Sequence, residues 1–551
     1  MYVRAVDALT LSGDDGRAGP VAEEACRRFA GHPDPATAAV VRYRAACYRA
    51  LDGHDTALPL MEEALRLFEQ APPSFDHAWA LRDYALFLLN MAGGVQPSIP
   101  PLYRALEVAE AAGAVALIPR ILSTIAAAAF VRGQVEDGFA ALQRGWALAR
   151  AARAGPSLVW LAVIESDALL KLGRFQRAAE VASHGLEDAR QGGLLSWYAA
   201  TMLAANAAEA LLALGRITEA AALIDPLTTT PPDRYYWLVH VARAEIDMLR
   251  GDTDAAAGRW RQIYAPPANL GRVDFGYEAA PRAAEAALWA ARPGDALQET
   301  RRALALFQAP DLTILSGRLL VAGMRACADL AGQARARRDQ PATVFAVAAA
   351  DSLASWVDEM ADAPFTDHPF VATVPAERAT WDAERARLAG SADPAAWGRA
   401  VKAWQDLGCP HRAGYAWWRQ AEALLDAGQP AAAAATSLRA AAAAADGHAP
   451  LLAEIRKLAE RARIRLQPLA DPAAQPPARA LAPYGLTGRE LAVLRLVAAG
   501  CTNAQIGAEL YISPKTASVH VTSILRKLGV SGRVQAATVA ERAGLLQSQQ
   551  P

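Results

Sequence analysis

Cysteine is scarce in this chain of 551 residues, with five scattered residues and no CxxC pair. A disulfide framework is therefore not expected, and the pattern suits a reducing cytosol. Cys409 and His411 form the one close Cys/His pair, which supplies too few ligands for a zinc site. We accordingly predict no metal site and no cofactor.

Long apolar runs are also missing. The longest mostly apolar run, 121–131, is bounded by Arg120 and Arg132 and is too short to cross a bilayer. The N-terminal MYVRAVDALTL lacks the apolar core of a signal peptide. We expect a cytoplasmic protein that has no membrane partner.

Signatures of catalysis are absent as well. The chain has no nucleophile elbow, no metal-ligand cluster and no Gly-Lys-Ser/Thr sequence of a phosphate-binding loop. Several carboxylates gather between 351 and 367, but His368 is the only further ligand type beside them, and we interpret them as a solvated helix end and loop. The chain is not expected to be an enzyme.

What the sequence does contain indicates a globular protein of several domains. The chain is too long for one core, its apolar content is 53% and its charged content is 21%. Its net charge of −1 excludes a protein that binds polyanions along its whole length. Any such binding must come from a local basic segment.

Glycines that follow apolar helical stretches recur over the first 300 residues. They stand at 13, 53, 93, 133, 173, 215, 251 and 294, separated by 36 to 43 residues, and several are followed five positions later by alanine, as at Ala178, Ala220 and Ala256. Each unit is predicted to be a helix, a tight turn and a second helix that approaches closely. Such hairpins bury their apolar faces by stacking, so 1–340 resembles a tetratricopeptide-like solenoid with a longer spacing.

The concave surface of such a solenoid can hold a peptide, a partner domain or a small effector. For any single residue of the repeat, packing in the core is the more frequent role. Aromatic residues after the TTTPPD turn and one helix further on are candidates for a lining: Tyr235, Tyr236, Trp237, Trp260 and Tyr264.

The remaining boundaries follow from changes in composition. We predict an irregular acidic and proline-bearing connection at 341–379 and a second helical-hairpin block at 380–466, whose tryptophans are interpreted as packing. A linker rich in proline and alanine occupies 467–483, and its composition predicts a semi-rigid tether. The last domain covers 484–547.

Four short helices are predicted in this last domain from local chemistry. Thr487 with Glu490, and Thr502 with Gln505, have the spacing of capping boxes. Gly500 and Gly529 suit left-handed helix stops. The third helix, 514–528, is capped by Ser513 and begins with proline, and a fourth follows Ser531.

The third helix has two different faces. One narrow apolar stripe, suited to packing on the first two helices, contains Ala517, Val521, Ile524 and Leu528. The opposite side has cations, hydroxyls and a small apolar group but no acidic residue, as a helix that enters the major groove of DNA requires. Its members are Lys515, Ser518, Val519, Thr522 and Arg526.

Positive charge is concentrated in the same domain. From Tyr484 to Leu546 there are seven Lys/Arg against three Glu, a net charge of +4, so the rest of the chain sums to −5. The basic segment is the one that would meet phosphate.

The run LTGRE…VLRLVAAG, TNAQIGAEL, ISPKTASVH and ILRKLGV resembles the LuxR-type helix-turn-helix domain over about 60 residues. The resemblance implies a helix-turn-helix at about 503–522, base-edge contacts from Ser518, Val519 and Thr522, and base or phosphate contacts from Lys515 and Arg526. Asn503 and Arg533 are further phosphate candidates. It also implies a homodimer on DNA through the fourth helix, 533–543. Ala517 stands where the family usually has valine.

The second block and the terminal domain together resemble the C-terminal half of the large ATP-binding LuxR-type regulators of actinobacteria. Those relatives begin with an ATPase module, whose phosphate-binding loop is absent from these 551 residues. The chain is either a natural short form or a fragment whose ATPase half is encoded elsewhere.

We therefore predict an all-α, sequence-specific regulator of transcription. Its partner is double-stranded DNA, which the helix 514–528 reads in the major groove. The helical repeats sense an unknown small-molecule or protein effector. The alternative is a protein-interaction scaffold whose terminal domain only dimerises.

Overall fold

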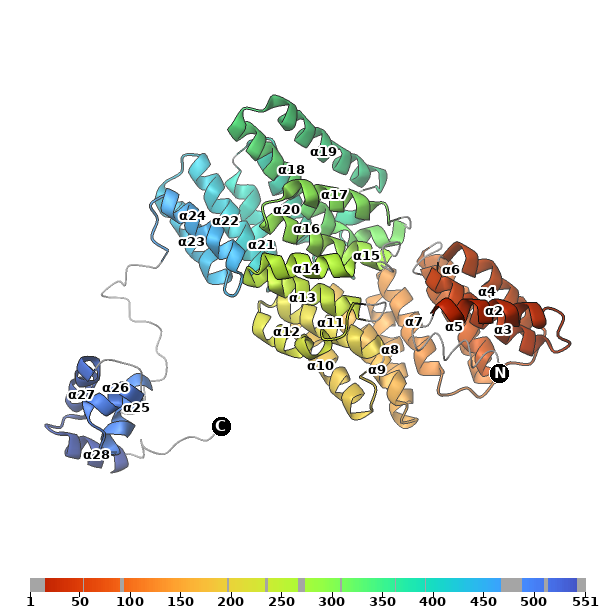
Figure 1. The fold of residues 1–551 in the computed structure, drawn as a ribbon, viewed down its shortest axis with the longest axis horizontal. Helices are drawn as coiled ribbons and strands as arrows, with labels where there is room; N and C mark the ends of the chain where they lie inside the picture. The colour runs from red at the N-terminus through yellow and green to blue at the C-terminus, as the bar shows by residue number, and fades with distance from the viewer. Residues whose placement is uncertain are drawn as a thin grey trace. The chain divides into compact units, whose positions relative to one another are not determined.

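The computed structural model shows a helical chain in two compact units, Met1–Leu466 and Gln467–Pro551 (Figure 1). It describes residues 15–52, 54–89, 94–195, 198–232, 236–265, 273–307, 310–361, 363–391, 393–466, 488–509 and 514–542. Over these ranges there is no strand, only an isolated bridge between His368 and Val371. The predicted all-α class is confirmed. None of the described helices has both the length and the apolar composition needed to cross a membrane. The predicted linker, 467–483, lies outside the described residues.

Helices of the first unit pack mainly against their neighbours along the chain, as in a solenoid. The first part comprises α2 (Asp15–Arg28), α3 (Pro35–Asp52), α4 (His54–Phe68), α5 (Phe75–Phe87), α6 (Val95–Ala111), α7 (Ile118–Val131), α8 (Val135–Ala151), α9 (Gly155–Lys171), α10 (Phe175–Gln191), α11 (Tyr198–Ala213) and α12 (Ile217–Ile224), followed by the 3-10 turn η2 (Asp225–Leu227).

The second part of the same unit continues the stack. It comprises α13 (Trp237–Arg250), α14 (Thr253–Ile263), α15 (Val273–Glu278), α16 (Ala280–Trp289), α17 (Pro293–Leu304), η3 (Pro310–Leu315), α18 (Gly317–Arg337), α19 (Gln340–Glu359), η4 (Ala363–Phe365), α20 (Val374–Leu388), α21 (Pro394–Asp406), α22 (Pro410–Asp426), α23 (Ala431–Ala444) and α24 (Ala449–Arg461).

Left-handed residues end the helices at the predicted turns. Gly133, Gly173, Gly215 and Gly251 all have φ between +67° and +85°. At Gly173 the amide bonds to the Leu170 carbonyl, and the next amide bonds to that of Leu169, which satisfies two carbonyls left open at the helix end.

A second set of left-handed turns lies midway between these and was not predicted. Its members are Gly113, Arg153 and Gly193, so that from 113 to 193 one helix ends every 20 residues. The sequence showed only the 40-residue period, because arginine in place of glycine at 153 hides the alternate turns.

The predicted turn at Gly294 is wrong. Gly294 lies inside α17, and the left-handed residue before that helix is Ala291, with φ +57°. Pro293 begins α17, where its fixed backbone angle and missing N–H cost nothing, so the helix starts before the glycine. The predicted turns at Gly13, Gly53 and Gly93 lie outside the described residues.

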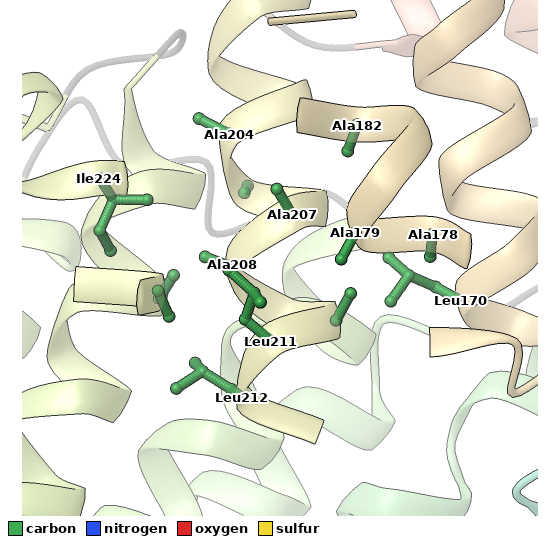
Figure 2. Close-up of a cluster of buried hydrophobic side chains, with 14 of the residues drawn as sticks. Leu170, Ala178, Ala179, Ala182, Ala204, Ala207, Ala208, Leu211, Leu212 and Ile224 are labelled. Atoms are coloured by element: carbon green, nitrogen blue, oxygen red, sulfur yellow. The ribbon is translucent and has the colours of Figure 1, made fainter. Parts of the chain in front are cut away.

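Small residues bring paired helices together, as predicted. Ala178, Ala220 and Ala256 are all at most 2% exposed. Figure 2 shows alanines of α10 and α11 in one buried cluster with Leu170 and Ile224. A Cβ added at Gly185 of α10 would lie 2.6 Å from the Cβ of Ala162 in α9. Helices α9 and α10 are therefore as close as their backbones permit.

The connection expected at 341–379 is irregular only between 360 and 373. Helix α19 occupies Gln340–Glu359, and α20 begins at Val374. The Asp339 carboxylate accepts from the Ala342 amide, and Pro341 occupies the first turn, so this helix has a well-formed start. Its buried face consists of Ala346, Ala349, Ala350, Leu353 and Val357, while acidic residues lie on the exposed side.

The block 380–466 also packs on the solenoid. Trp404, Cys409 and Ala413 belong to the same buried cluster as Val159, Leu203 and other residues of α9 to α14. Helices α20 to α24 are therefore part of the first compact unit.

The second unit contains α25 (Gly488–Ala498), α26 (Asn503–Glu509), α27 (Pro514–Leu528) and α28 (Arg533–Arg542). These four helices share one small apolar core, formed by Val493, Leu494, Val497, Ile506, Ala517, Val521, Ile524, Leu528, Ala536 and Ala540.

Candidate DNA-binding face and a charged cavity

Helix α27 has the two faces that the sequence predicts. Ala517, Val521, Ile524 and Leu528 are at most 9% exposed and pack in the core of the second unit. Ser518, Thr522 and Arg526 are exposed. The side chains of Lys515 and Val519 lie outside the described part of the structure. One side of the helix is thus held by the core and leaves polar groups of the other side available to a ligand.

Local hydrogen bonds position α26 and α27. The Thr502 amide donates to Gln505 Oε1 at 2.8 Å, and the Gln505 amide donates to Thr502 Oγ1 at 3.3 Å, which confirms the predicted capping box. Gly500 and Gly529 have φ of +81° and +68°, as expected of left-handed helix stops. Thr487 and Ser513, the other predicted caps, lie outside the described residues.

Glu490 of α25 anchors α27, a contact that the sequence did not reveal. Its buried carboxylate accepts from Ser523 Oγ at 2.8 Å and from Lys527 Nζ at 2.6 Å. Lys527 is therefore neutralised within the domain, and it contributes less to the basic face than the count of charges implied. The same contact fixes the C-terminal half of α27, which bears Arg526.

Asn503 and Arg533, both predicted phosphate candidates, are bound to each other. The Arg533 guanidinium donates to the Cys501 carbonyl at 3.1 Å and to the Asn503 side-chain oxygen. Helix α28 is thereby tied to the start of α26. The Asn503 amide nitrogen and the rest of the guanidinium are the groups left for another ligand.

Thr522 keeps its capacity to accept hydrogen bonds. Its hydroxyl donates to the Ser518 carbonyl at 3.0 Å within the helix. Both lone pairs of the Thr522 oxygen remain for a donor on a base edge, because the hydroxyl uses only its proton in this bond. The structure brings Ser518, Thr522 and Arg526 onto one exposed side, each four residues from the next.

A second candidate site lies inside the first unit. Helices from α9 to α24 surround a cavity of about 230 Å³. Five carboxylates and five cations line it, together with His411 and His448: Glu209, Glu245, Glu278, Glu285 and Glu377, with Lys171, Arg282, Arg318, Arg325 and Arg412.

Ion pairs connect most of these charges across successive helices. Arg282 contacts Glu209 at 2.9 Å and Glu245 at 2.8 Å. Arg318 contacts Glu245 at 2.8 Å and Glu285 at 2.6 Å. Each of these arginines lies between two carboxylates, so the network links α11, α13, α16 and α18 around the cavity.

The protonation of this network follows from its neighbours. Burial acts to raise the pKa of Glu285, but the adjacent Arg318 and Arg412 outweigh burial and hold that pKa at about 2. Burial, with His411 and Arg325 nearby, lowers the pKa of His448 to about 3. At neutral pH the cavity therefore contains an ionised Glu285 and an uncharged His448.

The aromatic residues proposed from the sequence as a lining have other positions. Trp237 and Trp260 are buried in a separate apolar cluster, which Tyr264 adjoins. Tyr236 packs beside the main cluster of the solenoid, and Tyr235 lies outside the described residues. The aromatic rings that do line the cavity belong to Phe175, Tyr277, Trp289, Trp404 and Tyr415. The sequence predicts packing for Trp404 and does not single out the others as a lining.

Comparison with known proteins concerns the C-terminal domain. Residues 485–540 match the family model described as bacterial regulatory proteins, luxR family. The transcriptional regulatory protein LiaR of Bacillus subtilis is 54% identical over 63 residues, which are 11% of this chain and 30% of LiaR. A nitrate/nitrite response regulator protein homolog of Haemophilus influenzae is 56% identical over 54 residues, 10% of this chain and 26% of the homolog.

Longer relatives match over the same domain. The putative HTH-type transcriptional regulator Mb0914c of Mycobacterium bovis is 42% identical over 59 residues, which are 11% of this chain and 7% of that protein. The chain thus spans less than a third of the length of the curated relatives it matches. A solved circular tandem repeat protein aligns with 84% of this chain and 94% of its own at 15% identity, with a TM-score of 0.15 that is too low to relate the two folds.

Proposed function

We propose, from the LuxR type of its C-terminal domain, that this chain is a sequence-specific DNA-binding regulator of transcription. The observation that supports this proposal is the exposed side of α27. It presents Ser518, Thr522 and Arg526 while the opposite stripe is buried. A helix held in this way enters the major groove, which is about 12 Å wide, with its outward side chains against the base edges.

The roles of the individual residues follow from their chemistry. Ser518 and Thr522 exchange hydrogen bonds with base edges, and Val519 contacts a thymine methyl group. Arg526 and Lys515 bind guanine edges or phosphate, since helical spacing predicts that both cations lie on the outward side of α27. Asn503 and Arg533 bind phosphates of the DNA backbone with the nitrogen atoms that their mutual contact leaves available.

Two copies of the chain bind together through α28. Val534 on this helix is 81% exposed, and the exposed Thr538 follows it one turn later. An apolar side chain in that position is suited to a second copy of the same helix, related by a two-fold axis. Such a dimer requires half-sites about one helical turn of DNA apart.

The first unit serves as the sensing module in this proposal. Its cavity is lined by charged and aromatic side chains from helices far apart in the sequence. A ligand that fills such a cavity favours the conformation in which these helices are correctly spaced, and it can thereby shift the population of the state that binds DNA.

Selection of DNA from a random-sequence library by the full-length protein tests the proposal. We expect enrichment of a palindrome at near-physiological salt. Thr522→Ala should weaken binding to that sequence by roughly 1–3 kcal/mol while leaving binding to random DNA unchanged. Lys515→Ala should weaken binding to all sequences. It should also reduce the slope of log affinity against log salt concentration by about one, because one phosphate contact is lost.

Arg495→Ala is the matched control, because Arg495 is an exposed cation of the same domain that belongs to α25 rather than to α27. It should leave both affinity and sequence preference unchanged. If Thr522→Ala changes neither quantity, the assignment of the outward side of α27 is wrong. If no sequence is enriched but the protein dimerises, the chain is instead an interaction scaffold.

A further inference from the structure

Arg325 is a buried cation without an adequate partner in the first unit. It is 8% exposed and lines the cavity. Among the described residues its Nε has no hydrogen-bond partner, and the carboxylate with which it pairs, that of Asp329, lies 3.8 Å away. Asp329 is already contacted by Arg387 at 2.8 Å and by Arg419 at 3.3 Å. Arg325 is thus a third cation on one carboxylate.

Aromatic rings hold the Arg325 guanidinium at the cavity wall. Its central carbon lies 4.2 Å from the ring centroid of Trp289 and 4.5 Å from that of Tyr415. Both rings also line the cavity. Stacking of this kind orients a guanidinium. Its N–H groups, which point outward in the guanidinium plane, remain available to an anion.

Glu377 is the complementary case, a buried carboxylate with no direct salt bridge among the described residues, on which Arg412 and Arg318 act from farther away. It is 7% exposed, lines the same cavity, and forms no ion pair within 4.0 Å over the part of the chain that the structure describes. The nearby Thr373 side chain acts to lower the pKa of its carboxyl group, but burial outweighs this effect. Its carboxylate packs against the α-carbon of Gly317, where any side chain would displace it.

Glu377 belongs to α20, and its carboxylate packs against the N-terminal end of α18, the helix that bears Arg325. Gly317, next to the Glu377 carboxylate, and Arg325 are eight residues apart in α18, about 12 Å along the helix axis. The other lining charges are already matched by ion pairs, such as Arg282 with Glu209 and Arg318 with Glu285.

We propose that this cavity binds a small zwitterionic metabolite of amino-acid size, with its carboxylate on Arg325 and its ammonium group on Glu377. A ligand with one charge of each sign supplies the missing partner of both groups and leaves the cavity neutral. An anion alone would leave Glu377 unpaired, and a cation alone would leave Arg325 unpaired, at a cost in both cases. The volume of about 230 Å³ fits a molecule smaller than typical drug-sized ligands.

Burial is the largest influence on Glu377 and raises the pKa of its carboxyl group. An ammonium group beside it would favour the ionised form, so binding of the zwitterion and ionisation of Glu377 support each other. The proposal deepens the sensing role given above. Because its test measures binding without DNA, failure of this assignment and failure of the DNA-binding proposal are distinguished.

The test uses the full chain, thermal unfolding and calorimetric titration. The probes are the twenty L-amino acids, 4-aminobutyrate and 6-aminohexanoate, each compared with the amine and the acid that lack one charged group. For L-phenylalanine these are phenethylamine and 3-phenylpropionate. We expect at least one zwitterion to bind, and its two singly charged analogues to bind about tenfold or more weakly.

Two substitutions identify the groups that bind. Arg325→Met and Glu377→Gln should each weaken binding of that zwitterion about tenfold or more. Arg325→Met should also abolish the preference for the zwitterion over its amine analogue, which a merely structural role of Arg325 would not do. The control variants Arg385→Met and Glu359→Gln change exposed residues of α20 and α19 and should bind as the unaltered chain does.

Glu377→Gln is nearly isosteric, so it decides the outcome even if Arg325→Met does not fold. The proposal is overturned if no zwitterion binds. It is also overturned if the singly charged analogues bind as tightly, or if Glu377→Gln binds with unchanged affinity.

Discussion

His448 caps helix α24 and also lines the cavity. Its Nδ1 accepts a hydrogen bond from the Leu451 amide at 3.3 Å, which requires that this nitrogen carry no proton. The rings of Trp289 and His411 lie 4.8 Å and 5.4 Å away, centroid to centroid. The folded protein therefore holds the imidazole neutral, consistent with a pKa lowered to about 3 by burial.

This gives a prediction for stability against pH. In the unfolded chain the imidazole has its ordinary pKa of 6.5, so below that pH the unfolded state binds a proton that the folded state excludes. The free energy of unfolding should fall as the pH drops from about 6.5 toward about 3. His448→Asn keeps an N-cap but removes this titration, so it should reduce the fall. Urea denaturation at several pH values measures both.

The comparison of the two proteins isolates His448, because every other titratable group is common to both. Burial lowers the pKa of His411 too, and its contribution should remain in the His448→Asn variant. Identical pH dependence in the two proteins would show that the imidazole of His448 binds its proton as readily in the folded protein as in the unfolded chain.

At the scale of helices, glycine has two opposite uses in the solenoid. Gly185 in α10 sits where a Cβ would meet the Cβ of Ala162 at 2.6 Å, while Gly332 in α18 has no heavy atom within 4 Å of such a Cβ. Overpacking of a core costs roughly 1–3 kcal/mol, whereas alanine in place of an unhindered helical glycine gains up to about 1 kcal/mol.

We therefore expect Gly185→Ala to destabilise the protein and Gly332→Ala to stabilise it. Thermal or urea-induced unfolding measures the change in the free energy of unfolding for each variant. The two changes should have opposite signs, although both variants replace glycine by alanine. Equal effects would mean that α9 and α10 separate at little cost, contrary to the close approach in the structure.

Helix α28 supports a prediction on dimerisation. Val534→Asn removes the exposed apolar side chain without adding charge that would repel phosphate. It should weaken binding to DNA with two half-sites and leave binding to one half-site nearly unchanged, as measured by titration of both duplexes. Val347→Asn, at another exposed valine on α19, is the control. Equal weakening on both duplexes would place the effect of Val534 in DNA contact rather than in dimerisation.

Elements specified by local chemistry were predictable from the sequence. The capping box of Thr502 and Gln505 and the stops at Gly500 and Gly529 act within a few residues, so their effect is legible in the sequence itself. The stripe of Ala517, Val521, Ile524 and Leu528 follows from helical periodicity in the same way.

Features that depend on distant partners were not predictable. Glu245 and Arg318 are 73 residues apart, and Arg412 and Glu285 are 127 apart, so nothing local indicates that they meet. Helix α19 lies where the sequence predicts a solvated helix end and loop, because acidic residues suit a loop as well as the exposed face of a helix. Lys527 was counted as free because its partner, Glu490, belongs to another helix.

At the scale of the whole molecule, two units have separate cores. The residues that form the core of α25 to α28 belong to no cluster of the first unit. Differential scanning calorimetry of the full chain should therefore resolve two transitions, since each unit can unfold cooperatively on its own.

Two substitutions assign these transitions. Glu490→Gln, which weakens the anchor of α27, should lower the midpoint of one transition only, and Gly185→Ala that of the other only. A single transition shifted by both variants would mean that the two units unfold together.

The order of the two units along the chain has a consequence for how the protein is made. Every residue that lines the cavity, from Leu170 to His448, precedes Gly488, where the four-helix domain begins. Translation adds about 5–20 residues per second, so the 40 residues between 448 and 488 take about 2–8 s. The ribosome thus adds the last residue of the cavity lining seconds before it begins α25. If the two proposals above hold, a nascent chain can meet a metabolite before it can meet DNA.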